Sequence, residues 1–455
     1  MFVMLERSLE QIRLLLLIPI KLPDIITLLI GGVAAFLLAF LFTFFVKAFC
    51  YKVGWLDKPA ERRVHKKAVP RLGGVAIYVA FVIASLFFYS PGPNLNAHAN
   101  ELTIYWLLIT AGALLVIVHA YDDIVGLGPW PKLIAQTMAV VIILGPWIDA
   151  TFHGILLFTF NNPFGVDHFI PNLPWYREPT LFLIVHNSDI ALAAIPAILL
   201  TWFWTVGMMN TVNWIDGMDG LATGVVGITA LFITLISFML HQYSIAVLSA
   251  IFTGAVFGFL PHNWNPAKIF MGDTGSMFLG LTLAVLSIMG GAKLALALMV
   301  LGVPILDVAL VIINRIRRGQ SPLHYDKTHL HHRLMAMGLS VKQICYLFYG
   351  VAIIFGLLAL SFSGIHAAHF YKFVGIVLVI VTMFGLIIWV DYRQRLRGVP
   401  IKLGGPDTSP DDNHDQTPQD SVPERLRDEP SENEAQVSPP QSHSTDEHVR
   451  TSLLQ

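Results

Sequence analysis

Adjacent carboxylates interrupt an otherwise apolar stretch of the chain. Asp122 and Asp123 stand together in HAYDDIVGLGPWPK, the segment that also contains Lys132. Neighbouring carboxylates repel each other, so the pair suits a cation or proton transfer better than a helix cap, although an interfacial cap is the alternative. Lys132 suits a phosphate contact, and its alternative is a lysine that reaches from a helix to the membrane surface.

A second polar cluster lies in NTVNWIDGMDG, between two long apolar runs. Asn213, Asp216 and Asp219 recur every three residues, so that in a helical turn they would share roughly one face. The glycines of this stretch predict a tight, non-helical connection between membrane spans. Because polar groups at membrane depth need partners or a function, the cluster is a candidate site, with a hydrated turn as the alternative.

A third cluster, FMGDTGS, places Asp273 among glycines and hydroxyl side chains. Glycines expose backbone amides beside a carboxylate and a hydroxyl, a combination that suits phosphate and metal chemistry. The stretch is not a P-loop, since no Gly-Lys-Ser/Thr follows it and no strand precedes it.

A basic segment near residue 330 carries three histidines, His329, His331 and His332, followed by Arg333. Three histidines could bind zinc. The segment also contains Arg317, Arg318 and Lys327, and this positive charge opposes a cation. We therefore expect the segment to contact an anion such as phosphate.

Two further features remain open. Asp307 lies inside the apolar run VPILDVALVI, where a carboxylate marks either a functional site or a buried polar pair. Lys66 and Lys67 belong to the basic stretch ERRVHKKAVPRLGG, which either sets the membrane topology or binds anionic lipid head groups.

The elements that position these clusters are predicted to be membrane-spanning helices. The chain has 455 residues, of which 55% are hydrophobic and 13% charged, whereas soluble domains are about one quarter charged. Two cysteines are too few for a disulfide framework. Apolar runs of spanning length predict an all-α polytopic membrane protein with about eleven transmembrane helices. They are expected near 25–46, 74–89, 102–120, 133–148, 190–208, 221–240, 244–261, 277–291, 294–314, 342–362 and 372–390.

Three regions follow from this pattern: an N-terminal interfacial segment (1–24), a transmembrane domain (25–398) and a C-terminal tail (399–455). From Leu403 onward the tail has 12 Asp and Glu against three Lys and Arg. Its composition predicts a disordered acidic segment.

The basic residues predict the sidedness of the domain. The loop from Lys47 to Gly73 holds eight Lys and Arg, and positively charged loops stay in the cytoplasm. With this orientation the four polar clusters and the C-terminus all fall on the cytoplasmic face. We therefore expect one active site assembled from several loops at that face.

Five motifs, taken in order, resemble a known family. RRVHKKAVPRLGGVAI, YDDIVGL with its following PK, NTVNWIDGMDGLA, FMGDTGSMFLG and DKTHLHHRL are similar to the polyprenyl-phosphate N-acetylhexosamine-1-phosphate transferases, glycosyltransferase family 4. The resemblance covers roughly residues 47–340. The HLHH sequence is similar to the branch that uses UDP-GlcNAc and undecaprenyl phosphate to initiate cell-wall or surface polysaccharides.

The resemblance implies a reaction, partners and a location. A Mg²⁺-dependent enzyme, with Mn²⁺ as an alternative ion, would transfer the N-acetylhexosamine 1-phosphate of a UDP-sugar to undecaprenyl phosphate and release UMP. It would act in the bacterial plasma membrane and bind no nucleic acid; a homodimer is left open.

The resemblance also implies roles for individual residues. Asn213 and Asp273 would hold the metal ion, and Asp219 would contact the uracil. Asp122 or Asp123 would deprotonate or orient the lipid phosphate, and Lys132 would neutralise phosphoryl charge. Further substrate contacts are expected from Asp216, His329, His331, His332, Arg333, Lys66 and Lys67.

Three alternatives are kept. The phospho-MurNAc-pentapeptide transferases of peptidoglycan synthesis share the reaction type. A membrane transporter would place its polar residues and broken helices near the middle of the membrane, whereas here they collect at one edge. A membrane scaffold without chemistry would not explain four polar loops on one face.

Overall fold

The computed structural model describes residues 24–57, 68–91, 101–145, 154–155, 194–289, 293–317, 319, 329–362 and 368–396. Contacts divide the chain into residues 1–404 and 405–455, and the described residues all belong to the first unit. The predicted tail (399–455), the loop containing Lys66 and Lys67, and the predicted interfacial segment (1–24) except for Asp24 lie outside the described residues. What was predicted for them stays a prediction.

The described chain is almost entirely helical, as the composition predicts. Its elements are α2 (Asp24–Val53), β1 (Leu56–Asp57), β2 (Val69–Pro70), α3 (Gly73–Phe88), α4 (Glu101–Val125), α5 (Pro129–Leu144), α6 (Ala194–Ile215), α7 (Leu221–Met239), α8 (Tyr243–Asn263), α9 (Gly272–Met289), α10 (Lys293–Val300), α11 (Gly302–Arg317), α12 (Leu330–Ala336), α13 (Val341–Phe362) and α14 (Ala368–Leu396).

Within the described residues, six helices are long and apolar enough to cross a membrane: α2, α4, α7, α8, α9 and α13. Shorter apolar helices occupy Gly73–Phe88, Pro129–Leu144, Pro304–Ile313 and Val374–Val390. A multi-pass membrane protein is therefore supported. The count of eleven spans stays a prediction, because the remaining helices do not meet both conditions of length and apolarity.

One predicted span is wrong in its continuity. The run at 294–314 forms two helices, α10 and α11, which meet at Leu301. Gly302 begins α11 and Pro304 follows within its first turn. Proline has no N–H to donate to the preceding turn and clashes with it, so a helix ends before proline more readily than it continues through it.

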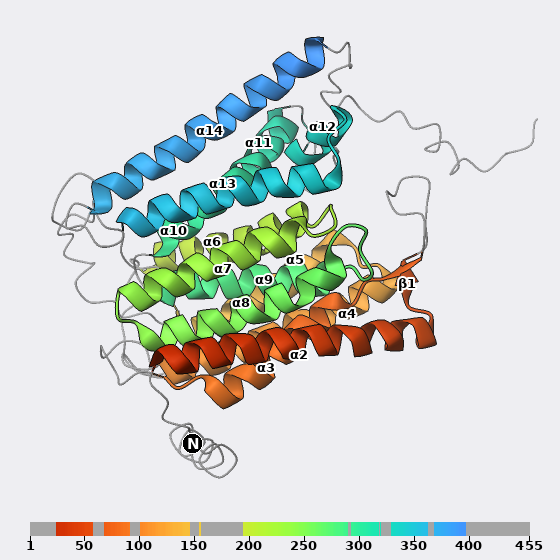
Figure 1. The fold of residues 1–455 in the computed structure, drawn as a ribbon, viewed down its shortest axis with the longest axis vertical. Helices are drawn as coiled ribbons and strands as arrows, with labels where there is room; N and C mark the ends of the chain where they lie inside the picture. The colour runs from red at the N-terminus through yellow and green to blue at the C-terminus, as the bar shows by residue number, and fades with distance from the viewer. Residues whose placement is uncertain are drawn as a thin grey trace, which may run out of the picture. The chain divides into compact units, whose positions relative to one another are not determined.

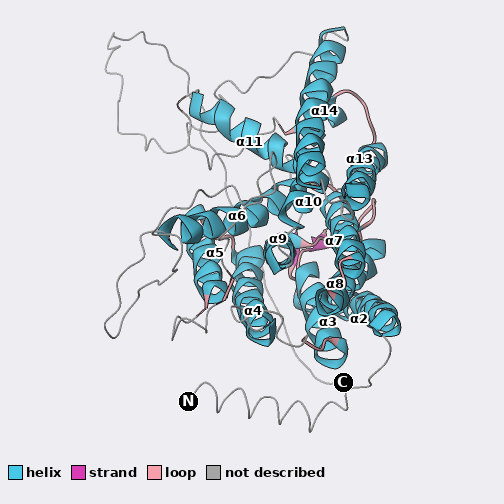
Figure 2. Cartoon of the chain, turned by 90° about the vertical axis from the view of Figure 1, so that its left-hand side faces the viewer, coloured by secondary structure: helices cyan, strands magenta, loops and turns pink. Residues whose placement is uncertain are grey.

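Helix α9 forms the centre of the bundle. Its side chains are buried from Gly272 almost to its end, and it contacts α3, α4, α6, α7, α8 and α10. Figure 1 shows the long helices side by side, and Figure 2, which looks nearly along them, shows α9 surrounded by its neighbours. By contrast, α2 leaves many apolar side chains exposed, among them Leu29 and Leu37, as expected for a surface facing lipid.

The segment that leads into α9 is held by the first two residues of α3. Gly73 and Gly74 donate backbone hydrogen bonds to Phe270 and Met271, each at 3.0 Å. A Cβ at Gly74 would lie 2.1 Å from the backbone nitrogen of Gly275, so only glycine permits this approach. The PRLGG motif therefore places the FMGDTGS motif.

Candidate active site

The predicted polar clusters meet at one end of the bundle, where β1 and α12 lie in Figure 1. Asp122 and Asp123 lie in the last turn of α4, and Lys132 lies in the first turns of α5. The glycines of the NTVNWIDGMDG stretch predicted a non-helical connection, but only part of the stretch is one. Helix α6 continues to Ile215, so Asn213 is helical and the turn begins only at Asp216.

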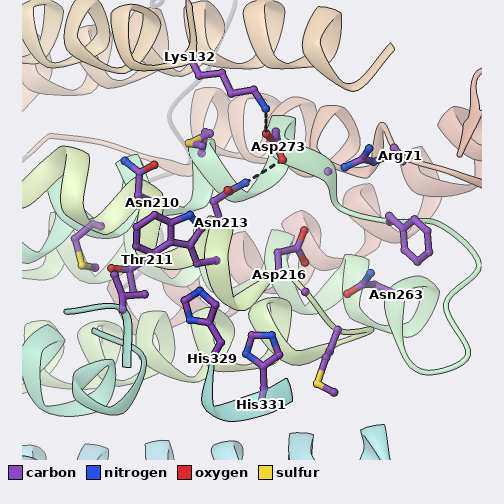
Figure 3. Close-up of a pocket in the computed structure, with 18 of the residues that line it drawn as sticks. Arg71, Lys132, Asn210, Thr211, Asn213, Asp216, Asn263, Asp273, His329 and His331 are labelled. Atoms are coloured by element: carbon purple, nitrogen blue, oxygen red, sulfur yellow. Dashed lines mark hydrogen bonds and ion pairs between the residues drawn. The ribbon is translucent and has the colours of Figure 1, made fainter. Parts of the chain in front are cut away.

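Asp273 lies at the centre of the cluster (Figure 3). Its Oδ2 accepts a hydrogen bond from Lys132 Nζ at 2.7 Å, and its Oδ1 accepts one from Asn213 Nδ2 at 2.9 Å. The three residues come from α9, α5 and α6. Tertiary structure thus brings together, within hydrogen-bond distance, a carboxylate, an amide and an ammonium that are 60 and 141 residues apart in the sequence.

Asp122 holds Lys132 from the other side. Its Oδ2 lies 2.6 Å from Lys132 Nζ, and its Oδ1 accepts the backbone N–H of Leu127 at 2.6 Å. Lys132 therefore bridges Asp122 and Asp273. An ammonium shared by two largely buried carboxylates is held in a defined place, which orients it for an anionic ligand.

Asp123 caps the N-terminus of α9. Its Oδ1 accepts the backbone N–H of Asp273, and its Oδ2 accepts both the N–H and the hydroxyl of Thr274, at 3.0, 3.0 and 2.6 Å. Arg71 Nε lies 3.8 Å from the carboxylate, whose side chain is 1% exposed. Gly272, with a φ of +72°, has no room for a Cβ beside Asp123. The two adjacent aspartates thus have different partners.

The donor set of the cluster fits a divalent cation. One carboxylate oxygen from each of Asp122, Asp123 and Asp273 lies within 4.8 Å of the others. These three acids face Lys132 and Arg71, a formal balance of one negative charge in favour of a cation. Asn213 uses its amide nitrogen for Asp273 and Ser276, which leaves its carbonyl oxygen as a further ligand. Oxygen ligands of this kind suit hard divalent cations.

The turn after α6 presents two carboxyl groups to the same cavity. Burial raises the pKa of Asp216 well above its usual range, and the nearby Asp273 carboxylate raises it further. Asp219 is held in place instead: its Oδ2 accepts hydrogen bonds from Asn265 Nδ2 at 2.8 Å and from the N–H of Ala267 at 3.0 Å. Asp216 is therefore protonated more readily than an ordinary aspartate.

The histidine segment joins the site through the short helix α12, which the sequence did not predict. His329, His331 and His332 line the cavity together with Asp216, Asp219 and Asp273, and Figure 3 shows His329 and His331 on the side of Asp216. Burial lowers the pKa of His331 well below its usual range. Arg333, on the same helix, is not among the described residues that line this cavity.

Several residues of the site were not among the predicted ones. Asn210 donates to Gln136 Oε1 at 2.8 Å across α5 and α6; it continues the three-residue period of Asn213 and Asp216, which was the available signal. Asn263 accepts from the N–H of Gly220 at 3.0 Å and from Thr223 at 2.8 Å. No comparable spacing marks it in the sequence.

The site opens onto a cavity of about 1750 Å³. Its polar lining includes Asp273, Lys132 and the three histidines, whereas Asp122 and Asp123 are not among the described residues that line it. Another part of the cavity is apolar and runs along α6, α10 and α11, where it is lined by Leu200, Phe203, Leu298, Ile305 and Ile312. A single cavity therefore joins polar groups suited to phosphates with a wall suited to a hydrocarbon chain.

The fold and the site define an integral membrane protein with a charged, oxygen-rich site where its helices end. Residues 105–291 match the family model described as Glycosyl transferase family 4. The chain is 33% identical over 344 residues to the probable undecaprenyl-phosphate N-acetylglucosaminyl 1-phosphate transferase of Bacillus subtilis, an alignment that covers 74% of this chain and 85% of the relative. This chain belongs to glycosyl transferase family 4.

Other relatives show the breadth of the family. The decaprenyl-phosphate N-acetylglucosaminephosphotransferase of Mycolicibacterium smegmatis is 33% identical over 343 residues, covering 70% of this chain and 78% of the relative. The phospho-N-acetylmuramoyl-pentapeptide-transferase of Staphylococcus epidermidis is 30% identical over 318 residues, covering 68% and 89%. The predicted family is confirmed, and the pentapeptide transferases are the more distant of these relatives.

Proposed function

We propose that this chain transfers N-acetylglucosamine 1-phosphate from UDP-N-acetylglucosamine to undecaprenyl phosphate, releasing UMP. One observation carries the proposal: Asp273, bonded to Lys132 and Asn213, opens into a cavity whose far wall is apolar. Such a site suits the meeting of a soluble nucleotide sugar with a lipid phosphate at a membrane surface. The Bacillus subtilis and Mycolicibacterium smegmatis relatives are named for undecaprenyl phosphate and decaprenyl phosphate, which agrees with the apolar wall.

The metal ion of this reaction would be Mg²⁺, held by Asp273 and by the carbonyl oxygen of Asn213. Mg²⁺ takes few ligands from protein and completes its shell with water and substrate phosphates. When bound it would neutralise charge on the UDP diphosphate. Mn²⁺, which also prefers oxygen ligands, is the expected substitute.

The acceptor would approach along the apolar wall. Exposed side chains on α6, among them Leu199 and Phe203, lead toward this wall, and α11 forms its opposite side. A polyprenyl chain lying there brings its phosphate to Lys132. Lys132 would hold that phosphate by charge, while Asp122 orients Lys132 and accepts a proton from the phosphate when it enters as the monoanion.

The UDP-sugar donor would occupy the part of the cavity next to the turn after α6 and the histidine segment. Asp216 and the histidines line it together with the turn that holds Asp219. Asp219 is already bonded to the loop at 265–267, so its contact with the uracil would use its other oxygen. Lys66 and Lys67, and Arg333 beyond the cavity lining, would add positive charge near the diphosphate.

The transfer of the sugar 1-phosphate would be a nucleophilic substitution at phosphorus. An oxygen of the lipid phosphate forms a bond to the β-phosphorus of the UDP-sugar. The bond from that phosphorus to the bridging oxygen breaks, and UMP leaves with the bridging oxygen and its electron pair. Lys132 and the histidines stabilise the charge on these oxygens.

The location follows from the same chemistry. Nucleotide sugars are made in the cytoplasm, so the site should face the cytoplasm of the bacterial plasma membrane. We further infer that the product initiates a cell-wall or surface polysaccharide. The transporter alternative predicts uptake into vesicles without UMP release.

The test is UMP release by the purified full-length protein in detergent with undecaprenyl phosphate and Mg²⁺. Parallel reactions contain UDP-GlcNAc, UDP-GalNAc or UDP-MurNAc-pentapeptide. We expect turnover with UDP-GlcNAc that requires both the lipid and the metal. Turnover with UDP-MurNAc-pentapeptide alone would assign the chain to the pentapeptide branch, and turnover with none would refute the proposal. Lys132→Met serves as the matched inactive control.

A further inference from the structure

Asp307 on α11 holds the start of the histidine segment with both of its oxygens. Oδ2 lies 3.0 Å from His329 Nδ1, and Oδ1 accepts the backbone N–H of Leu330 at 2.9 Å. Asp307 and His329 are each 7% exposed. The Asp307 carboxylate, although it lies inside an apolar helix, therefore has a defined partner in the histidine segment.

The contact determines which nitrogen of His329 carries a proton. A carboxylate only accepts hydrogen bonds, so Nδ1 must donate. His329 lines the cavity, whereas Asp307 is not among the described residues that line it. Within the described residues the hydrogen bond of the His329 ring is made by Nδ1 and not by Nε2. Nε2 is therefore the nitrogen that remains available to a ligand in the cavity.

The surroundings of His329 separate it from the neighbouring histidine. Its ring lies 5.9 Å from that of Trp214, over which the guanidinium of Arg315 lies at 5.8 Å. On its other side it stacks on His331 at 5.8 Å and 10°. The Nε2 of His331 is buried without a hydrogen-bond partner in the described chain, while His329 has a carboxylate behind it.

We propose that Asp307 is a positioning residue of the transferase site. It keeps the proton of His329 on Nδ1, orients the ring, and so presents Nε2 to the nucleotide sugar. The proposal rests on the function proposed above. Groups that fix the tautomer of a metal-ligating histidine change metal affinity or activity by about 10- to 100-fold when removed, and we expect a loss of similar size for His329.

Asp307→Asn tests the tautomer directly. The carboxamide has one oxygen and one amide nitrogen, so it cannot accept from both N–H groups. The backbone N–H of Leu330 cannot rearrange, whereas an imidazole can move its proton. We therefore expect the oxygen to face Leu330, the amide to donate to Nδ1, and the His329 proton to move to Nε2.

The measurement is a two-bond ¹H–¹⁵N correlation spectrum of the full-length protein labelled with ¹⁵N-histidine in detergent. The His329 signals are identified by their loss in His329→Gln. A change from the Nδ1–H to the Nε2–H tautomer in Asp307→Asn supports the proposal. An Nε2–H tautomer in wild type, or an unchanged Nδ1–H tautomer in the variant, would overturn it. This readout does not depend on turnover.

UMP release gives the second readout. Asp307→Asn should lower kcat/KM by about 10- to 100-fold, and it should have little further effect in His329→Gln, because coupled residues are not additive. Independent effects that multiply would mean that Asp307 acts on the fold alone. Leu330→Ala loosens the packing of α12 while keeping the backbone N–H; it should lower thermal stability without changing the tautomer.

The two failures are distinguishable. Wild type without turnover on any UDP-sugar would refute the proposed function, and the tautomer would still be read from the spectra. Wild type with turnover, but with an unchanged tautomer and multiplying effects of the two variants, would refute the role of Asp307 alone.

Discussion

Replacing Asp123 by asparagine separates a structural role of this carboxylate from a catalytic one. Asp123 accepts three hydrogen bonds from the first residues of α9, two from backbone N–H groups and one from the Thr274 hydroxyl. Asparagine retains one acceptor oxygen, which can still bond the N–H of Asp273. Its amide nitrogen then faces the N–H of Thr274, so that two donors oppose each other. The hydroxyl of Thr274 can rotate to accept instead.

The expected loss follows from these contacts. A buried donor left without a partner costs about 1–3 kcal/mol. Removing a negative charge from a helix N-terminus costs about 0.3–1 kcal/mol at exposed positions and up to about 2 kcal/mol at partly buried ones. Because the Asp123 side chain is 1% exposed, the upper part of each range applies. We expect Asp123→Asn to lower the free energy of unfolding by about 3–5 kcal/mol.

The assay is unfolding of the purified protein by SDS in mixed micelles, followed by circular dichroism, together with UMP release. Asp122→Asn is the matched control. Its remaining oxygen can accept from Leu127, and Lys132 keeps Asp273, so its stability loss should be smaller. If Asp123 instead acted as a general base, its replacement would lower kcat by about 10²–10⁴-fold and leave the stability unchanged. Asp123→Asn within about 0.5 kcal/mol of wild type would refute the capping role.

Four further outcomes are expected. Asp273→Asn should raise the Mg²⁺ concentration for half-maximal UMP release and lower turnover, because the metal loses a charged ligand; unchanged Mg²⁺ dependence would contradict the metal assignment. Truncation after Arg397 should leave turnover in detergent almost unchanged, and a loss of more than about tenfold at normal expression would show that the acidic tail takes part. Single cysteines in the polar clusters, in a chain lacking Cys50 and Cys345, should resist a membrane-impermeant thiol reagent in intact cells, and labelling at any of them would break the one-face arrangement; the positions tested are 121–132, 210–220, 262–276 and 315–341. Since burial lowers the pKa of His331, the unfolded chain takes up its proton first as the pH falls. Its contribution to stability is therefore present above the unfolded pKa and lost below it, by about 1.4 kcal/mol per pH unit. Wild type should lose more stability than His331→Gln between about pH 7.5 and about pH 5.5, and equal losses would contradict this.

Local features of the sequence predicted the elements well. Long apolar runs identified the helices, because a helix satisfies its own backbone hydrogen bonds and needs only apolar side chains to lie in lipid. The prediction of one continuous helix at 294–314 was wrong, because apolarity over the run does not reveal the effect of Gly302 and Pro304 on the backbone. Apolarity is a sum over a window, whereas a helix break depends on one residue.

The site was predicted in its composition but not in its contacts. Each cluster was recognisable because charged residues are rare in apolar surroundings. Adjacent residues of a helix point in different directions, but which partner each one meets depends on where the neighbouring helices pack. That Asp123 caps α9 while its neighbour Asp122 holds Lys132 could therefore not be predicted. The sequence left open whether Asp307 marks a functional site or a buried polar pair. In the structure it pairs with His329, which lies 22 residues further along the chain.

The sequence alone determined that this chain is a helical membrane protein of glycosyl transferase family 4, and which side chains could serve its chemistry. Hydropathy and motif order depend only on the order of residues along the chain, so they can be determined without knowing how the helices pack. Only the tertiary structure decided the partner of each carboxylate. Hydrogen bonds extend about 3 Å, and bringing Asn213, Lys132 and Asp273 within that distance requires α5, α6 and α9 to pack with their ends aligned.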